Sequence, residues 1–338
     1  MDGTQFGTTA DGEAVHKFVI SGGGLRASVM SWGAVLQDLR LEDHDAPLVL
    51  GFEKFEDYPA HSPYMGAIAG RCANRIRQGR FTIDGRRYQA DTNFLGKHML
   101  HGGARGFGKQ VWATGLHGPD FVTFTLHSPD GDMGFPGAME VSCTYRLKIP
   151  GTLSVELTAT TEESTLCNLA HHSYFNLDDG GSGDILDHRL MMPAEAYLPV
   201  DDELIPTGVV EPVAGTAFDF RHSREIRKER KGEQVVYDHN FCLAAARGPL
   251  RQAAWAQGAS SGVEMEVWST EPGVQFYAGH KLACKVPGLG GRLYGAHAGF
   301  ALEPQVWPDA PNHPYFPQAT LHPGQIYRQV TEYRFRLP

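Results

Sequence analysis

The feature that most restricts the fold is a strict alternation of apolar and polar residues across residues 140–162. The alternation runs along two arms that meet at Pro150 and Gly151, a pair that favours a turn. A period of two puts the apolar side chains on one face of a β-strand, so the segment predicts two antiparallel strands with one buried face. The apolar residues of the two arms are Val141, Cys143, Tyr145, Leu147, Leu153, Val155, Leu157 and Ala159.

Further strands are indicated along most of the chain. Stretches with the same alternation occur at residues 80–90, 263–267, 274–279 and 333–337. In the first of these stretches, Asp84 and Gly85 are typical of a two-residue hairpin turn. The 40 glycines and 21 prolines also favour many short strands joined by tight loops.

Signals for helix are weak. The charged segment 221–231 has the length of a short helix, but no apolar residue recurs along it to form a packing face, so we expect an exposed loop or turn there. Hydrophobic residues make up 41% of the chain, enough for a large core, and no shift in composition marks a linker. The sequence therefore predicts an all-β fold, with one large antiparallel domain over residues 1–338.

Charge and targeting signals narrow the class of partner. The formal net charge of −9 argues against nucleic acid or an anionic membrane surface, because both require a surplus of Lys and Arg. Residues 1–12 lack the pattern of a secretory signal, and no apolar run is long enough to span a bilayer. Five scattered cysteines without a Cys-x-x-Cys pair fit a reducing compartment, so we expect a cytoplasmic protein. The strand patterns reveal no apolar interface, which favours a monomer or a weak homodimer.

Five stretches carry more reactive side chains than strands or turns require. They are residues 70–76, 98–103, 168–177, 236–243 and 301–314. Most of these side chains also have an ordinary interpretation. Asn74 and Arg75 fit a solvated turn, His101 fits a loop, and Asp238 fits a strand-end cap or a surface ion pair. Glu303 is harder to explain in this way, because an unpaired carboxylate within an apolar segment is costly to bury.

Other classes of site lack their signatures. Although the chain has 16 histidines, none of the usual metal-ligand spacings is present, so we expect no metal. The dinucleotide fingerprint Gly-x-Gly-x-x-Gly and the hydrolase motif Gly-x-Ser-x-Gly are both absent. Acidic and histidine-bearing loops with aromatic neighbours on a β scaffold favour a polyhydroxylated small molecule, handled by acid and base groups.

Six motifs together carry a specific resemblance. "GRCANRI", "LHGG", "HSYFNL", "YDHNF", "TEPGVQFY" and "LEPQVWPDAPN" occur in the order and at about the spacing seen in galactose mutarotases, the aldose 1-epimerases. The resemblance covers nearly the whole chain. It implies a large antiparallel β-sandwich, often called a supersandwich, and interconversion of the α and β anomers of free aldohexoses such as galactose and glucose. It also implies that no metal or organic cofactor is used.

The resemblance also assigns roles to residues. Glu303 matches the general base of the family, and His172 matches the general acid. Tyr174 is expected to border the sugar. The residues that match those holding the sugar hydroxyls are Asn74, Arg75, His101, Asp238 and Gln275. The chain departs from the family at His171 and His280, where asparagine is usual, and both departures bear on the sugar preference.

The adjacent histidines cannot both face one sugar. In an extended strand, successive side chains point to opposite faces, so His172 shares its face with Tyr174, and His171 shares the other with Ser173. An acid working near pH 7 needs a pKa above the usual value of about 6.5, and we expect nearby carboxylates to supply that shift. Three alternatives stay open: a hexose-phosphate epimerase, a glycoside hydrolase using Asp238 and Glu303, and a non-catalytic sugar-binding β-sandwich.

Overall fold

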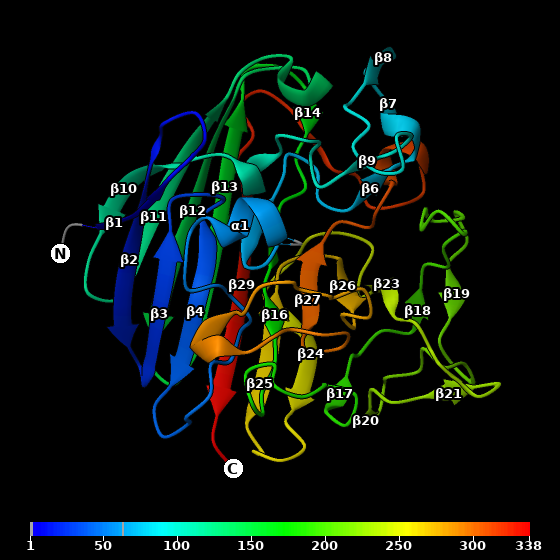
Figure 1. Cartoon of the computed structure of the whole chain (residues 1–338). Helices are drawn as coiled ribbons and strands as arrows, with labels where there is room; N and C mark the ends of the chain where they lie inside the picture. Colours follow the sequence, from blue (N-terminus) through cyan, green and yellow to red (C-terminus); the bar gives the residue numbers. More distant parts are fainter. Residues whose placement is uncertain (1–2, 63) are drawn as a thin grey trace.

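The computed structural model describes residues 3–62 and 64–338, and within them almost all regular structure is β (Figure 1). The prediction of an all-β fold is confirmed. One short helix, α1 (Asp57–His61), lies among the described residues, and none of their helices is long and apolar enough to cross a bilayer. The single-turn 3-10 helices are η1 (Arg77–Gly79), η2 (Phe107–Lys109), η3 (Asp132–Gly134), η4 (Leu289–Gly291) and η5 (Ala310–Asn312).

The largest sheet has nine strands and contains the predicted hairpin as β12 and β13. The two arms pair antiparallel from Met139 opposite Thr161 to Lys148 opposite Thr152, and the predicted apolar residues are buried. In spatial order the strands are β10 (Ala113–His117), β11 (Phe121–Ser128), β12 (Met139–Lys148), β13 (Thr152–Thr161), β29 (Tyr327–Arg336), β25 (Glu264–Ser269), β24 (Arg251–Gln257), β17 (Arg189–Met191) and β20 (Arg224–Glu225).

A four-stranded sheet packs against the β10–β13 end of the large sheet, as Figure 1 shows. Apolar side chains from both sheets form one buried cluster that also includes residues of the six-stranded sheet described below. The hydroxyl of Tyr145 crosses between the layers and donates to the carbonyl of Ala34 at 2.7 Å. The four strands are β1 (Thr4–Thr8), β2 (Ala14–Gly22), β3 (Leu25–Met30) and β4 (Val35–Leu41). This shared core supports the hypothesis that residues 1–338 form a single domain.

A six-stranded sheet carries much of the polar chemistry. Its central strands β27, β26 and β23 are antiparallel neighbours. In order, the sheet consists of β16 (Tyr174–Phe175), β27 (Phe300–Gln305), β26 (Gly273–Tyr277), β23 (Asp238–Cys242), β18 (Ala196–Tyr197) and β19 (Glu211–Pro212).

Five short strand pairs complete the fold. At the predicted hairpin of Asp84 and Gly85, both turn residues have positive φ (49° and 76°), as a two-residue hairpin of the favoured type requires. The charged segment 221–231 contains no helix and contributes only β20 and β21, as expected of a loop. The pairs are β7 (Arg80–Ile83) with β8 (Arg86–Gln89), β6 (Arg75–Ile76) with β9 (Met99–Leu100), β15 (Ala170–His172) with β5 (Ala67–Ala69), β14 (Thr165–Leu166) with β28 (Thr320–Leu321), and β21 (Glu229–Arg230) with β22 (Glu233–Gln234).

Candidate active site

One cavity of about 200 Å³ brings together every residue that the sequence predicts for the site. The predicted residues come from six separate stretches of the chain, and the fold places them around a single hollow. Those that line it are Asn74, Arg75, His101, His172, Tyr174, Asp238, Gln275 and Glu303. The stretches selected by their chemistry therefore meet in space.

Three of these residues stand on adjacent strands of the six-stranded sheet. Gln275 of β26 lies directly opposite Glu303 of β27, and Asp238 lies near the start of β23. The Gln275 side-chain amide donates to Asp238 Oδ1 at 2.7 Å, while Arg75 Nη2 lies 3.6 Å from Asp238 Oδ2. Asp238 is thus held between an amide and a guanidinium, which fixes both of its oxygens relative to the cavity.

Asn74, Arg75 and His101 come from two segments with unusual backbone geometry. Asn74 and His101 both have positive φ, 62° and 49°, a conformation that costs non-glycine residues about 1–3 kcal/mol. The Asn74 side-chain oxygen accepts the backbone N–H of Arg75 at 3.0 Å, and the backbone N–H of Asn74 donates to His101 Nδ1 at 3.1 Å. A neutral His101 ring therefore carries its proton on Nε2, where it can donate to a sugar oxygen.

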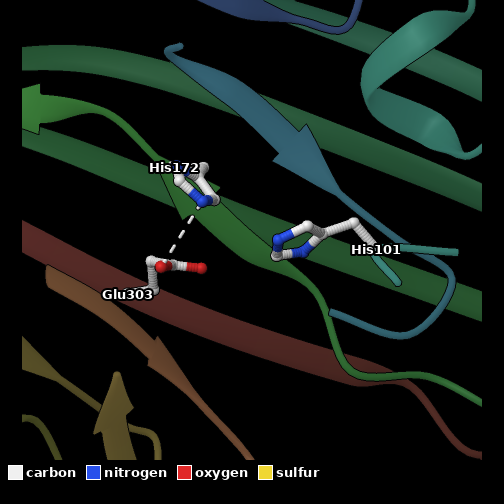
Figure 2. Close-up of side chains that lie close together, drawn as sticks. All are labelled: His101, His172 and Glu303. Carbon is white, nitrogen blue, oxygen red and sulfur yellow. Dashed lines mark ion pairs between the residues drawn. The ribbon is translucent and has the colours of Figure 1, made fainter. Parts of the chain in front are cut away.

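The catalytic candidates face each other across two strands. His172 ends β15, and its Nε2 lies 3.5 Å from Glu303 Oε1 in β27 (Figure 2). Both side chains are almost completely buried, at 5% and 2% exposure. The ring of Tyr174 lies 5.1 Å from the ring of His172, on the face that the alternation predicts. The imidazole of His172 and the carboxyl group of Glu303, which can exchange a proton, therefore lie side by side in one buried wall of the cavity.

Burial controls the protonation of this pair. It lowers the pKa of His172 to about 4, and the opposing effect of Asp238 is smaller. Burial also raises the pKa of Glu303 well above its ordinary value. The expectation that neighbouring carboxylates raise the pKa of His172 above its ordinary value is therefore wrong, since desolvation outweighs their attraction. Between the two shifted pKa values the pair holds one proton, and burial favours the form in which neither group is charged.

His171 occupies the opposite side of the strand, as the alternation predicts. Its Nδ1 lies 3.2 Å from the hydroxyl of Tyr333, and its Nε2 lies 2.9 Å from the hydroxyl of Ser173. The Tyr333 hydroxyl donates onward to the carbonyl of Leu302 at 3.4 Å, so the His171 ring donates from Nδ1 and accepts at Nε2. Burial lowers the pKa of His171 to about 3, which leaves it neutral.

The arginines of residues 70–77 do not share a strand face. Only Arg75 and Ile76 are extended, in β6, and Arg77 begins a 3-10 turn. The guanidinium of Arg71 is buried and donates to Ser128, Thr165 and the carbonyls of Pro136, Gly137, Ser128 and Pro129. Arg71 therefore anchors the loop that presents Asn74 and Arg75, while Arg75 alone reaches the cavity.

Sequence reasoning missed five residues of the cavity wall, namely Tyr64, Phe94, Leu100, Tyr277 and Lys281. Tyr277 could have been found, because it follows Gln275 by two residues in the same strand and so lies on the same face. The ring of Tyr64 lies 4.6 Å from that of His101, and Phe94 lies beneath the Arg75 guanidinium at 4.7 Å. No local pattern distinguishes these two aromatics from core residues.

His280, the second departure from the family, lies outside the cavity lining. Its ring is 5.2 Å from the ring of Tyr277, which itself lines the cavity. His280 therefore borders the cavity through Tyr277.

One set of side chains is close enough to hold a metal ion. The donor atoms of His101, His172 and Glu303 lie within 4.8 Å of one another (Figure 2). A metal-bound histidine normally donates its second ring N–H to an acceptor. In His101 the Nδ1 instead accepts an N–H from Asn74, so Nε2 carries the proton and offers no lone pair. This arrangement fits a hydrogen-bond donor better than a metal ligand.

Known proteins of similar sequence share nearly the full length of the chain. The family described as Aldose 1-epimerase matches residues 16–334. Galactose mutarotase of Rattus norvegicus is 44% identical over 328 residues, which cover 96% of this chain and 95% of that protein. Aldose 1-epimerase of Escherichia coli (strain K12) is 37% identical over 322 residues, which cover 92% of each chain.

Solved structures agree with this similarity. An aldose epimerase homologue from C. elegans superposes with a TM-score of 0.88 at 31% identity, covering 96% of this chain and 99% of that one. Galactose 1-epimerase from Lactobacillus acidophilus NCFM gives a TM-score of 0.83 at 25% identity, covering 99% and 98%. The predicted supersandwich is therefore confirmed. The chain belongs to the aldose 1-epimerase family, and it is an isomerase that interconverts the anomers of sugars.

Proposed function

We propose that the substrates are free aldohexoses such as galactose and glucose, and that Glu303 and His172 perform the proton transfers. The observation that carries the proposal is the buried His172–Glu303 pair, whose facing atoms are 3.5 Å apart in the wall of one small cavity. The names of the similar proteins from rat and other mammals, which are galactose mutarotases, support galactose as a substrate.

Ring opening requires two proton transfers. Glu303, as a carboxylate, takes the proton of the C1 hydroxyl, and His172, as an imidazolium, gives a proton to the ring oxygen. The bond between C1 and the ring oxygen breaks, its electron pair stays on the oxygen, and C1 becomes an aldehyde. Rotation about the C1–C2 bond presents the other face, and the same transfers run backwards to close the ring. Each transfer contributes roughly 10²- to 10⁴-fold to the rate.

The single proton of the buried pair suits this cycle. The charged form, with carboxylate and imidazolium, begins ring opening, and the uncharged form ends it. Both forms hold the same number of protons, so no proton has to enter from solvent. Because burial stabilises the uncharged form of the pair, it favours the open-chain product of each opening step. Contacts of the sugar hydroxyls with the charged pair then have to offset the cost of forming it.

The remaining predicted residues hold the sugar. Asp238, fixed by Gln275 and Arg75, accepts from sugar hydroxyls, while His101 Nε2 and the guanidinium of Arg75 donate to them. Asn74 keeps Arg75 in place, and Tyr174 forms a wall beside His172. Positioning of this kind supports catalysis without a cofactor, because it replaces a chance encounter by a fixed geometry.

Polarimetry with α-galactose and α-glucose tests the proposal. We expect the protein to speed the approach to anomeric equilibrium and to release no product from an aryl glycoside. Glu303→Gln and His172→Asn should each lower kcat by at least about 10²-fold, because each removes one proton transfer. The exposed residues Glu229 and His222 provide matched controls, and Glu229→Gln and His222→Asn should leave kcat unchanged. Substantial activity in either site variant would remove its residue from the assigned role.

The compartment and assembly state are part of the proposal. We place the enzyme in the cytoplasm as a monomer or weak homodimer. Five free thiols, of which Cys72, Cys143 and Cys167 are buried, support a reducing compartment. Light scattering at increasing protein concentration measures the mass, and a tight dimer at the lowest concentration would contradict this part.

A further inference from the structure

The strand that carries His172 and the strand that carries Glu303 share a register, but their main chains pair only at one end. Tyr174 lies opposite Ala301, and Phe175 lies opposite Phe300. Continuing this register by two residues places His172 opposite Glu303. There, however, β15 pairs with β5 instead, with His172 opposite Ala67. The catalytic pair therefore sits where the two segments stay neighbours without a main-chain ladder between them.

Side chains replace the missing main-chain partners along this edge of β27. The Tyr333 hydroxyl donates to the carbonyl of Leu302 at 3.4 Å, and the Gln329 side-chain amide donates to the carbonyl of Pro304 at 2.8 Å. Pro304 has no N–H, so the residue after Glu303 leaves no unsatisfied donor at the open edge. The carbonyls of Leu302 and Pro304 thus keep hydrogen bonds although β15 forms no ladder with β27.

Asn168 joins the segment of His172 to the segment of Glu303 beyond the catalytic pair, at the end opposite the β16–β27 ladder. Its side-chain oxygen accepts the backbone N–H of Val306 at 2.8 Å, and its side-chain amide donates to the carbonyl of Val306 at 3.3 Å. The backbone of Asn168 also donates to the carbonyl of Arg71 at 2.9 Å and accepts the N–H of Ala73 at 2.6 Å. One buried residue therefore joins the strand of His172, the strand of Glu303 and the loop of Asn74 and Arg75.

We propose that Asn168 is a positioning residue that holds His172 and Glu303 at their working separation. This inference rests on the proposed roles of those two residues. Asn168 lies four residues before His172, and Val306 lies three residues after Glu303. The clamp therefore acts at short range on both members of the pair. In the described part of the chain, no main-chain ladder joins β15 to β27. The Asn168 side chain bridges the two segments directly, whereas the links through Tyr333 and through Tyr327 and Gln329 pass through further side chains.

Asn176 offers a matched comparison within the same segment. It lies four residues after His172, is completely buried, and its side-chain amide donates to the carbonyl of Ala298 at 2.9 Å. Its side-chain oxygen accepts the N–H groups of Asp178 and Asp179, both at 3.0 Å. At this end the strands are already joined by the β16–β27 ladder. Replacing the Asn176 side chain removes at least as many hydrogen bonds as replacing that of Asn168. The main-chain ladder between β16 and β27 still aligns the catalytic pair at this end.

The test compares Asn168→Ala with Asn176→Ala in kinetics and in thermal unfolding. We expect Asn168→Ala to lower kcat on the order of 10²-fold, because displacements near 1 Å have effects of that size, with little change in KM. Asn176→Ala should keep a kcat close to wild type while losing as much or more thermal stability. Activity losses that follow the stability losses in both variants would overturn the proposal.

The pH profile separates positioning from general damage. Attraction between His172 and Glu303 widens the pH range over which the pair holds one proton. If the two side chains move apart, the bell-shaped dependence of kcat on pH should therefore become narrower. We expect this narrowing in Asn168→Ala and an unchanged width in Asn176→Ala. An unchanged width in both contradicts the inference.

A conservative variant covers the case in which Asn168→Ala does not fold. Asn168→Asp keeps an acceptor for the Val306 N–H and loses the donor, so it should show an intermediate kcat and partial narrowing. A wild-type kcat and width in Asn168→Asp would overturn the proposal. Wild-type protein without mutarotase activity would instead reject the proposed function, which keeps the two failures distinct.

Discussion

The two halves of the site are built in different ways. Asp238, Gln275 and Glu303 stand on neighbouring strands with an uninterrupted antiparallel register, so the ladder itself sets their spacing. Asn74, Arg75, His101 and His172 stand on short strands and turns, held by side-chain hydrogen bonds. The sheet half has regular backbone geometry without conformational strain, whereas the turn half contains residues in left-handed backbone geometry.

The difference shows where an enzyme of this kind stores strain. Tyr64, Asn74 and His101 all have positive φ, and no residue of β23, β26 or β27 does. A site that surrounds a small sugar needs groups above the sheet as well as on it, and turns supply them at a conformational cost. Contacts outside the cavity have to offset that cost. Arg71 is the clearest source of such contacts.

The largest effect should come from Arg71→Met. Arg71 joins the loop before Asn74 to Ser128, Thr165 and the 128–137 loop, and its replacement leaves several buried acceptors without a donor. We expect the free energy of unfolding to fall by about 3 kcal/mol, and KM to rise because Asn74 and Arg75 shift. Denaturant unfolding and steady-state kinetics measure the two effects.

An exposed arginine serves as the control for this variant. Arg328 makes a surface ion pair with Glu156, and such pairs contribute only about 0–1 kcal/mol. Arg328→Met should therefore be close to wild type in both measurements. If Arg71→Met is no less stable than Arg328→Met, the turn half does not depend on this anchor.

The two halves should affect the pH dependence of stability in opposite directions, because burial lowers the pKa of His172 in the turn half and raises that of Glu303 in the sheet half. The pKa of His172 in the folded protein, about 4, lies below its ordinary value of 6.5. The contribution of His172 to the free energy of unfolding is therefore present above pH 6.5 and is lost as pH falls towards 4. The folded pKa of Glu303 lies above its ordinary value of 4.5, so its contribution is present below pH 4.5 and is lost as pH rises through the folded value.

Two variants test these opposite signs. Relative to wild type, His172→Asn should lose less stability between pH 6.5 and 4, and Glu303→Gln should lose less on the alkaline side. The His172 difference should be about 3 kcal/mol for a pKa lowered from 6.5 to about 4, and the Glu303 difference should have the opposite pH dependence. Urea unfolding followed across pH measures both. Curves that run parallel to wild type at every pH would show that neither group titrates as its burial requires.

The same contrast explains which features could be predicted from sequence. Part of the ladder half follows from local pattern: the alternation at residues 274–279 identifies the strand of Gln275, and a carboxylate in an apolar run marks Glu303. The turn half depends on long-range contacts that carry no local pattern. The spacing of Arg71, Arg75 and Arg77 would place them on one face of a continuous strand, yet they take three different environments. The pKa of His172 depends on how deeply the folded chain buries it, which composition does not show.

The smallest effect should come from His171→Asn, beside the proposed proton donor His172. His171 points away from the cavity, towards Tyr333 and Ser173, and stays neutral because burial lowers its pKa. Asparagine offers a donor and an acceptor as well, so kcat should stay near wild type and stability should fall by only about 1 kcal/mol. Polarimetry and thermal unfolding measure both. A kcat as low as that of His172→Asn would mean that the chain from His171 through Tyr333 to the carbonyl of Leu302 controls Glu303, and the two faces of the strand would then act as one unit.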